Sequence, residues 1–145
     1  MFSIGFCRAF SIERIHPKTS RIYQGEIDRM NRYLFSKAGI DVNEGVARCG
    51  GDEALYEHLL DRFSEESRFE EMREALASQD VQGAFAAAHA LKGLSGNLSM
   101  NRLYRDIMPL VEELRAGSLS GTADLFARVE VDYREVIQVL EQRVR

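Results

Sequence analysis

Apolar residues recur at helical spacing along most of this chain, and only two prolines interrupt its 145 residues. A spacing of three and four places such residues on one side of a helix, which must then be buried against another surface. Stripes of this kind run over residues 23–34, 55–76, 81–98, 103–114 and 125–140. A chain made almost entirely of amphipathic helices predicts an all-α protein.

Capping residues predict where these helices begin and end. Asp41 with Glu44 three residues later resembles a capping box, and Asp52 and Asp80 each precede an apolar stripe. Gly117 is placed to end the helix over 103–114. Four long helices joined by short connections predict an antiparallel up-down-up-down four-helix bundle, with short N-terminal capping helices.

Two interruptions are expected within the stripes. The stripe after Asp52 changes phase near residues 64–67, which predicts a bend or break there. Pro109 lies inside a helical stripe and lacks a backbone donor, so we expect a kink in that helix. The residues expected to face the core around the first interruption are Leu55, Leu59, Phe63, Phe69, Met72 and Leu76.

Charge and composition exclude several classes of function. The 19 basic and 23 acidic residues are interleaved and give a net charge of −4, so no basic stripe predicts binding to nucleic acid. No apolar run reaches the length of a membrane span, so membrane insertion is not expected. Cys7 and Cys49 lack ligand spacing and are interpreted as free thiols, which favours a cytoplasmic protein.

Residues 1–38 are expected to form an N-terminal extension with an amphipathic helix, separate from a bundle over 39–145. The stripe of this extension consists of Tyr23, Ile27, Met30 and Leu34. Its role stays open: it could cap the bundle, mediate self-association or connect the chain to a kinase. The oligomeric state is also open, because the apolar face of this helix could be buried within the same chain or against a partner.

The segment "AHALKGLSGNL" places an imidazole, an ammonium group and two glycines inside a predicted helix. At 100° per residue, His89 lies about 130° from the centre of the apolar stripe, so it faces outward. Ala86, Lys92, Gly93 and Gly96 share its face. The two glycines together cost about 2 kcal/mol of helix stability, so a functional or packing reason is expected for them.

An exposed neutral imidazole is a competent nucleophile that can take up a phosphoryl group, and Lys92 would stabilise the added negative charge. The small residues around His89 would leave room for a partner to approach. Two plainer interpretations remain open: an ordinary surface histidine, and glycines that serve close helix packing. The histidines lack metal-ligand spacing and no nucleotide-binding motif occurs, so neither a metal nor another cofactor is predicted.

The segment Ala88-His89-Ala90-Leu91-Lys92-Gly93, followed by Gly96-Asn97-Leu98, resembles the signature of histidine-containing phosphotransfer (HPt) domains of bacterial multistep phosphorelays. The stretches "GIDVNEGVARCGGDEALYEHLLDRF" and "ALASQD" resemble the usual lead into this signature, so the similarity covers roughly residues 39–143. Two departures stand out. The family often has glycine at the position of Ser99, and Pro109 interrupts a helix that usually continues.

The resemblance implies a phosphorelay carrier rather than a self-sufficient enzyme. His89 would accept a phosphoryl group from an aspartyl phosphate on a response-regulator receiver domain and pass it to another receiver. Lys92 would be the stabilising cation, and Ala86, Gly93 and Gly96 the small residues that give a partner access. The expected partners are receiver domains and a hybrid histidine kinase.

A receiver is expected to dock on the face that carries His89, burying a patch formed by this helix and the helix after Asp52. The alternative function is a docking module that binds a receiver or kinase domain without being phosphorylated. A cofactor-binding bundle is disfavoured, because His89 faces outward and no Glu-x-x-His pair occurs.

Overall fold

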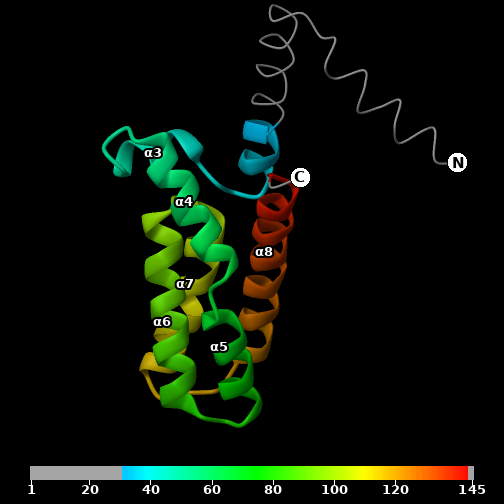
Figure 1. Ribbon diagram of the computed structural model, residues 1–145. Coiled ribbons are helices and arrows are strands. Elements are labelled where there is room, and N and C mark those ends of the chain that lie inside the picture. Colours follow the sequence, from blue (N-terminus) through cyan, green and yellow to red (C-terminus); the bar gives the residue numbers. More distant parts are fainter. Residues whose placement is uncertain (1–30, 144–145) are drawn as a thin grey trace, which may run out of the picture. The chain divides into compact units, whose positions relative to one another are not determined.

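The computed structural model describes residues 31–143, and from Leu34 on the chain forms one compact unit (Figure 1). Residues 31–37 are helical, whereas most of the stripe predicted over Tyr23–Leu34 lies outside the described residues. The all-α prediction is confirmed. The helices that follow are α3 (Val42–Arg48), α4 (Glu53–Ser64), α5 (Arg68–Ala77), α6 (Val81–Asn97), α7 (Asn101–Arg115) and α8 (Thr122–Arg143).

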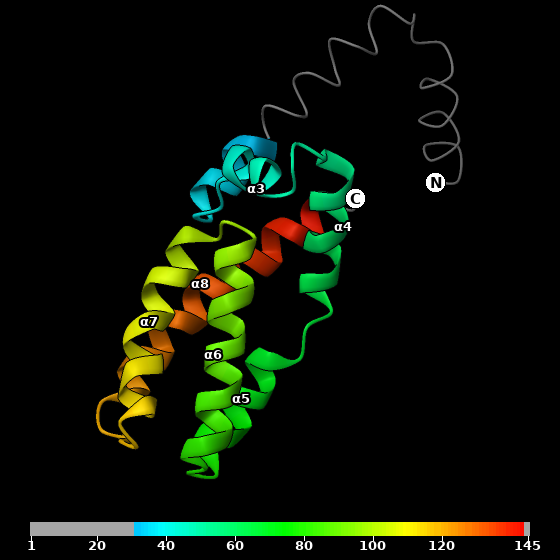
Figure 2. The same cartoon turned by 90° about the vertical axis from the view of Figure 1, so that its left-hand side faces the viewer.

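The long helices pack side by side as a bundle. Consecutive helices are in contact from α5 to α6, from α6 to α7 and from α7 to α8 (Figures 1 and 2). The ring of Phe69 on α5 stacks on Tyr133 of α8 at 4.0 Å and on Phe126 at 5.5 Å between centroids. These aromatic contacts join α5 to α8. Helix α4 lies above α5 in Figure 1 and packs against α8 and α3.

The core runs along the axis of this bundle. Most of its side chains come from the stripes that the sequence predicts, and each fully buried large aliphatic side chain contributes about 1.5–3 kcal/mol. The fully buried ones on α6, α7 and α8 include Leu91, Leu103, Ile107, Leu110, Val111, Leu114, Val136 and Leu140.

The predicted helix caps are confirmed. The side chain of Asp41 accepts a hydrogen bond from the backbone N–H of Glu44 at 3.0 Å, which confirms Asp41 as an N-cap. The reciprocal half of the capping box does not form, because the N–H of Asp41 donates to the carbonyl of Ser99 and the Glu44 carboxylate pairs with Arg48. Asp52 and Asp80 accept bonds of 2.9 and 3.0 Å from backbone N–H groups three residues later. Gly117 follows α7 with a φ of +75°, a left-handed conformation that glycine adopts without strain.

The interruption near residues 64–67 is also confirmed, since α4 ends at Ser64 and α5 begins at Arg68. Pro109 lies on the exposed side of α7, which continues through it to Arg115. The missing backbone donor of Pro109 therefore does not end the helix. The kink expected there stays a prediction.

One prediction about α4 is wrong. Leu55 and Leu59 were expected to face the core, but their side chains are 44% and 37% exposed. The adjacent row of apolar residues is the buried one and contains Tyr56, Leu60 and Phe63. Periodicity cannot separate two neighbouring rows that are both apolar.

Tyr56 decides which row is buried. Its hydroxyl donates a hydrogen bond of 2.8 Å to the backbone carbonyl of Leu98, at the end of α6. Its ring lies against Gly45, where a Cβ atom would overlap it. This fit between α3, α4 and α6 turns Leu55 and Leu59 outward, on the side where the groove described below opens.

Candidate functional site

The outward face of α6 carries the predicted site. The opposite face of the helix is buried through Ala84, Ala87, Ala88, Leu91 and Ser95. The side chain of His89 is exposed, as the helical spacing predicts. The imidazole is therefore available to a partner from outside the bundle.

The geometry of helical side chains predicts which two residues lie under the imidazole of His89. Side chains on an α-helix lean toward its N-terminus, so the imidazole of His89 lies over the turn that contains Phe85 and Ala86. The Phe85 and His89 rings have centroids 5.6 Å apart and are tilted by 30°. Ala86 is exposed, and its small side chain leaves the neighbouring surface open.

Lys92 is placed to interact with a group bound to His89. It lies one turn after His89 on the same face of α6, and its side chain is half-buried. Among residues 31–143, no carboxylate forms an ion pair with Lys92 within 4.0 Å. Its charge is thus available to a phosphoryl group.

The two glycines of the signature have different surroundings. A Cβ atom on Gly93 would meet nothing within 4 Å, so the space above this residue is open. A Cβ atom on Gly96 would lie 3.1 Å from the ring of Tyr104 on α7. Gly96 therefore makes room for Tyr104, which is the packing interpretation that the sequence left open.

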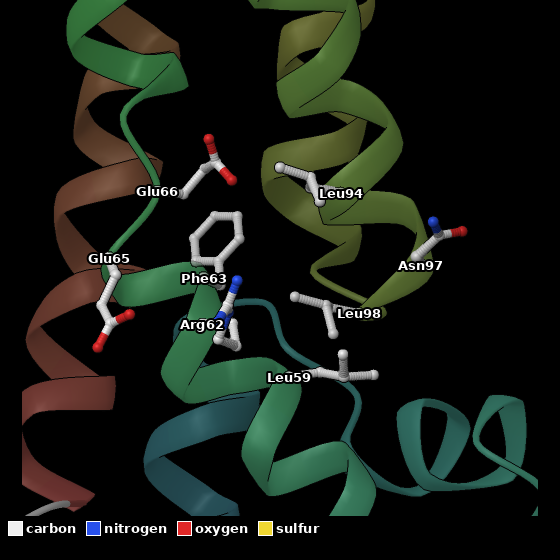
Figure 3. Close-up of a pocket in the computed structure, with 8 residues that line it drawn as sticks. All are labelled: Leu59, Arg62, Phe63, Glu65, Glu66, Leu94, Asn97 and Leu98. Carbon is white, nitrogen blue, oxygen red and sulfur yellow. The ribbon is translucent and has the colours of Figure 1, made fainter.

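A groove opens between α4 and the C-terminal end of α6 (Figure 3). Its volume is about 350 Å³, and Figure 3 shows Phe63 and Leu59 on one side facing Leu94 and Leu98 on the other. Polar side chains border it, namely Arg62, Glu65, Glu66 and Asn97. The sequence predicts a patch from these two helices but not which residues line it.

Among residues 31–143, the carboxyl group of Asp132 on α8 has the pKa furthest from its usual value, and it interacts with Asp106 on α7. Burial and the neighbouring Asp106 carboxyl raise the pKa of Asp132 to about 6. A hydrogen bond from Arg105 lowers the pKa of Asp106. The Nε of Arg102 lies 2.9 Å from an oxygen of Asp132, and Arg102 also forms an ion pair with Glu135.

Over the described residues there is no cluster of three or more histidine, cysteine, aspartate or glutamate side chains that could hold a metal ion. His58 is exposed on α4, and Cys49 is a free thiol. None of the helices between residues 31 and 143 combines the length and apolar character that a membrane crossing requires.

Comparison with known families agrees with the resemblance seen in the sequence. The family model described as "Hpt domain" matches residues 58–143, from the middle of α4 to the end of α8. The chain has no significant match among curated proteins or solved structures. The match spans more than half of the chain and contains the exposed histidine, its lysine and both glycines, and this chain belongs to the Hpt domain family.

Proposed function

We propose that this protein is a phosphorelay carrier in which His89 is the phosphoacceptor. The observation that carries the proposal is the outward face of α6. There, an exposed imidazole lies one turn before a lysine that forms no ion pair with any carboxylate of residues 31–143, and the space over Gly93 is open. Membership of the Hpt domain family supports a role in phosphotransfer.

The chemistry requires little from the carrier itself. A neutral imidazole nitrogen of His89 attacks the phosphorus of an aspartyl phosphate on a receiver domain, so an N–P bond forms as the P–O bond breaks. The receiver's aspartate leaves as a carboxylate with the bonding electron pair, and the proton stays on the other ring nitrogen. Lys92 stabilises the phosphoryl oxygens now held on the imidazole. The reverse reaction delivers the group to another receiver.

The groove between α4 and α6 supports a docking role for this side of the bundle. Leu94 lies five residues after His89, which is about 7.5 Å along α6 and about 140° around its axis, so a partner seated on the groove would have to reach around α6 to contact His89. Leu55 and Leu59 add exposed apolar surface from α4. A receiver that covers this surface and reaches around α6 would place its aspartate over His89.

We propose that its partners are receiver domains and a hybrid histidine kinase, which would place the protein in the cytoplasm. The receiver would supply the aspartate and its metal ion, so the carrier would not act as an enzyme by itself. The alternative is docking without phosphorylation, and the following experiment distinguishes the two.

The test is transfer of labelled phosphate from a phosphorylated receiver to the wild type and to His89→Gln. We expect acid-labile, alkali-stable label on the wild type and none on His89→Gln. His58→Gln is the matched control, because His58 is also an exposed histidine on a helix of the same protein. It should accept label at the wild-type rate.

Two outcomes would contradict the proposal. Label on His89→Gln at the wild-type rate would show that another residue is the acceptor. Binding of a phosphorylated receiver with no label on the wild type would favour the docking module.

A further inference from the structure

Three side chains follow one another beside the site: the His89 imidazole, the Phe85 ring and the Arg115 guanidinium. Phe85 lies one turn before His89, and the two rings are 5.6 Å apart between centroids. The guanidinium carbon of Arg115, the last residue of α7, lies 5.4 Å from the centroid of the Phe85 ring. These contacts link the end of α7 to the imidazole through a single aromatic ring.

We propose that Phe85 is a positioning residue for the His89 imidazole and that Arg115 holds Phe85 in place. This inference deepens the proposed function and depends on it for its effect on phosphotransfer. Neither residue would touch the phosphoryl group. Phe85 would select the rotamer of His89, and Arg115 would restrict the movement of Phe85 through a cation–π contact.

The surroundings of Phe85 support this role. Its ring is half-buried and packs against the core, so its position is constrained by the bundle. Ala86, the other residue under the imidazole, is too small to restrict it. An exposed imidazole without an aromatic neighbour would exchange between rotamers, and only some of them would present a nitrogen to a receiver.

Arg115 is itself oriented by its own helix. Its Nε lies 3.3 Å from a carboxylate oxygen of Glu112, one turn earlier on α7. The guanidinium is therefore held between that carboxylate and the face of Phe85. Because α6 and α7 pack along each other (Figure 2), this contact also ties His89 to the neighbouring helix.

The first test is spectroscopic and needs no partner. In the full-length protein, Phe85→Leu keeps an apolar side chain but removes the ring, so the three-bond couplings that report the χ1 rotamer of His89 should move toward rotamer-averaged values. Phe85→Tyr keeps the ring and should keep these His89 couplings near their wild-type values. Unchanged His89 couplings in Phe85→Leu would overturn the inference.

The second test is the rate of labelled phosphate transfer from a phosphorylated receiver. Phe85→Leu should slow the transfer by about tenfold, as expected for a misplaced nucleophile, and Phe85→Tyr should restore it. Arg115→Gln should slow it by about twofold to fivefold, which corresponds to the loss of one exposed cation–π contact.

Phe126→Leu is the matched control. The ring of Phe126 also stacks on an aromatic ring and lies under an arginine, with Arg73 at 6.0 Å, but it belongs to α8. This variant should leave both the χ1 couplings of His89 and the transfer rate unchanged. If Phe85→Leu slows transfer no more than Phe126→Leu does, Phe85 has only a structural role.

The two proposals can fail separately. A wild-type protein that binds a phosphorylated receiver but accepts no label would refute the phosphoacceptor role of His89. The χ1 couplings of His89 in Phe85→Leu would still show whether Phe85 positions the ring.

Discussion

The backbone carbonyl of Ser99 accepts a hydrogen bond of 2.9 Å from the backbone N–H of Asp41. This bond joins the turn between α6 and α7 to the residue that caps α3. Ser99 achieves it with a φ of +55°, in the left-handed region that favours glycine. Its side chain is fully buried, and its hydroxyl has no hydrogen-bond partner in the described part of the chain.

Ser99→Gly should therefore stabilise the protein. Glycine relieves the left-handed strain, about 1 kcal/mol, and removes a buried unpaired hydroxyl, which costs about 1–3 kcal/mol. The greater freedom of glycine in the unfolded chain offsets about 0.4–1 kcal/mol of this gain. We expect a net increase of about 1–3.5 kcal/mol in the free energy of unfolding, measured with urea.

Ser99→Ala separates the two contributions to that gain. Alanine removes the hydroxyl but keeps the Cβ atom in the left-handed conformation. Ser99→Ala should thus show only the part of the stability gain that comes from removing the unpaired hydroxyl. A Ser99→Gly protein less stable than the wild type would contradict the prediction.

The carboxyl of Asp132 should make stability depend on pH. Its pKa is raised to about 6 in the folded protein, above the value of about 3.9 that an aspartate has in an unfolded chain. The folded state therefore binds this proton more tightly. The contribution to stability is fully present below about pH 4 and is lost as the pH rises through about 6.

Asp132→Asn should remove that dependence, because the amide resembles the protonated acid and cannot ionise. Relative to the variant, the wild type should lose about 1–3 kcal/mol between pH 4 and pH 7. The measurement is urea unfolding of both proteins at several pH values. Comparing the two proteins cancels the opposite trend from carboxyls with lowered pKa values that do not contact Asp132, such as Glu71 and Glu44. Parallel curves for both proteins would contradict the assignment.

Adding bulk at Gly93 should block function without harming the fold. The space above Gly93 is open, so Gly93→Leu should fit and should gain about 1 kcal/mol of helix stability. A receiver would then meet a leucine one turn from His89, and we expect transfer of labelled phosphate to fall at least tenfold. Thermal unfolding and the transfer rate, measured on the same preparation, test both parts.

The smaller variant Gly93→Ala is the control for helix propensity. It should gain similar stability with a much smaller loss of transfer. If Gly93→Leu transfers phosphate at the wild-type rate, no partner approaches this part of α6.

Charge placed on the groove should weaken receiver binding. Leu59 is 37% exposed at the edge of the groove, so Leu59→Glu should leave the fold intact while placing a carboxylate against an apolar partner surface. We expect the Kd for a receiver to rise at least tenfold by calorimetry. Val131→Glu, at an exposed apolar residue on α8, should leave the Kd unchanged. Equal effects of the two substitutions would exclude the groove as the docking surface.

Local features of this protein could be predicted from the sequence because neighbouring residues carry them. The caps at Asp41, Asp52 and Asp80 depend on a side chain and a backbone N–H three residues away. The exposure of His89 follows from helical periodicity and one apolar stripe. The break between α4 and α5 is visible as a change of phase.

Features that depend on the fit between helices were decided only by the tertiary structure. Tyr56 and Leu55 are neighbours in the sequence of α4. Tyr56 is buried because its ring fits against Gly45 and its hydroxyl reaches the backbone carbonyl of Leu98, and this arrangement leaves Leu55 exposed. Gly93 and Gly96 are alike in the sequence, but Tyr104 lies over only one of them.

The sequence by itself thus determined the helices, their ends and the face on which the reactive imidazole stands, since these follow from contacts within one or two turns. The tertiary structure decided which apolar row of α4 is buried, where the groove opens and which side chain lies over Phe85, the aromatic neighbour of His89. Those outcomes depend on side chains such as Arg115 that are distant in the chain and meet only when the helices pack.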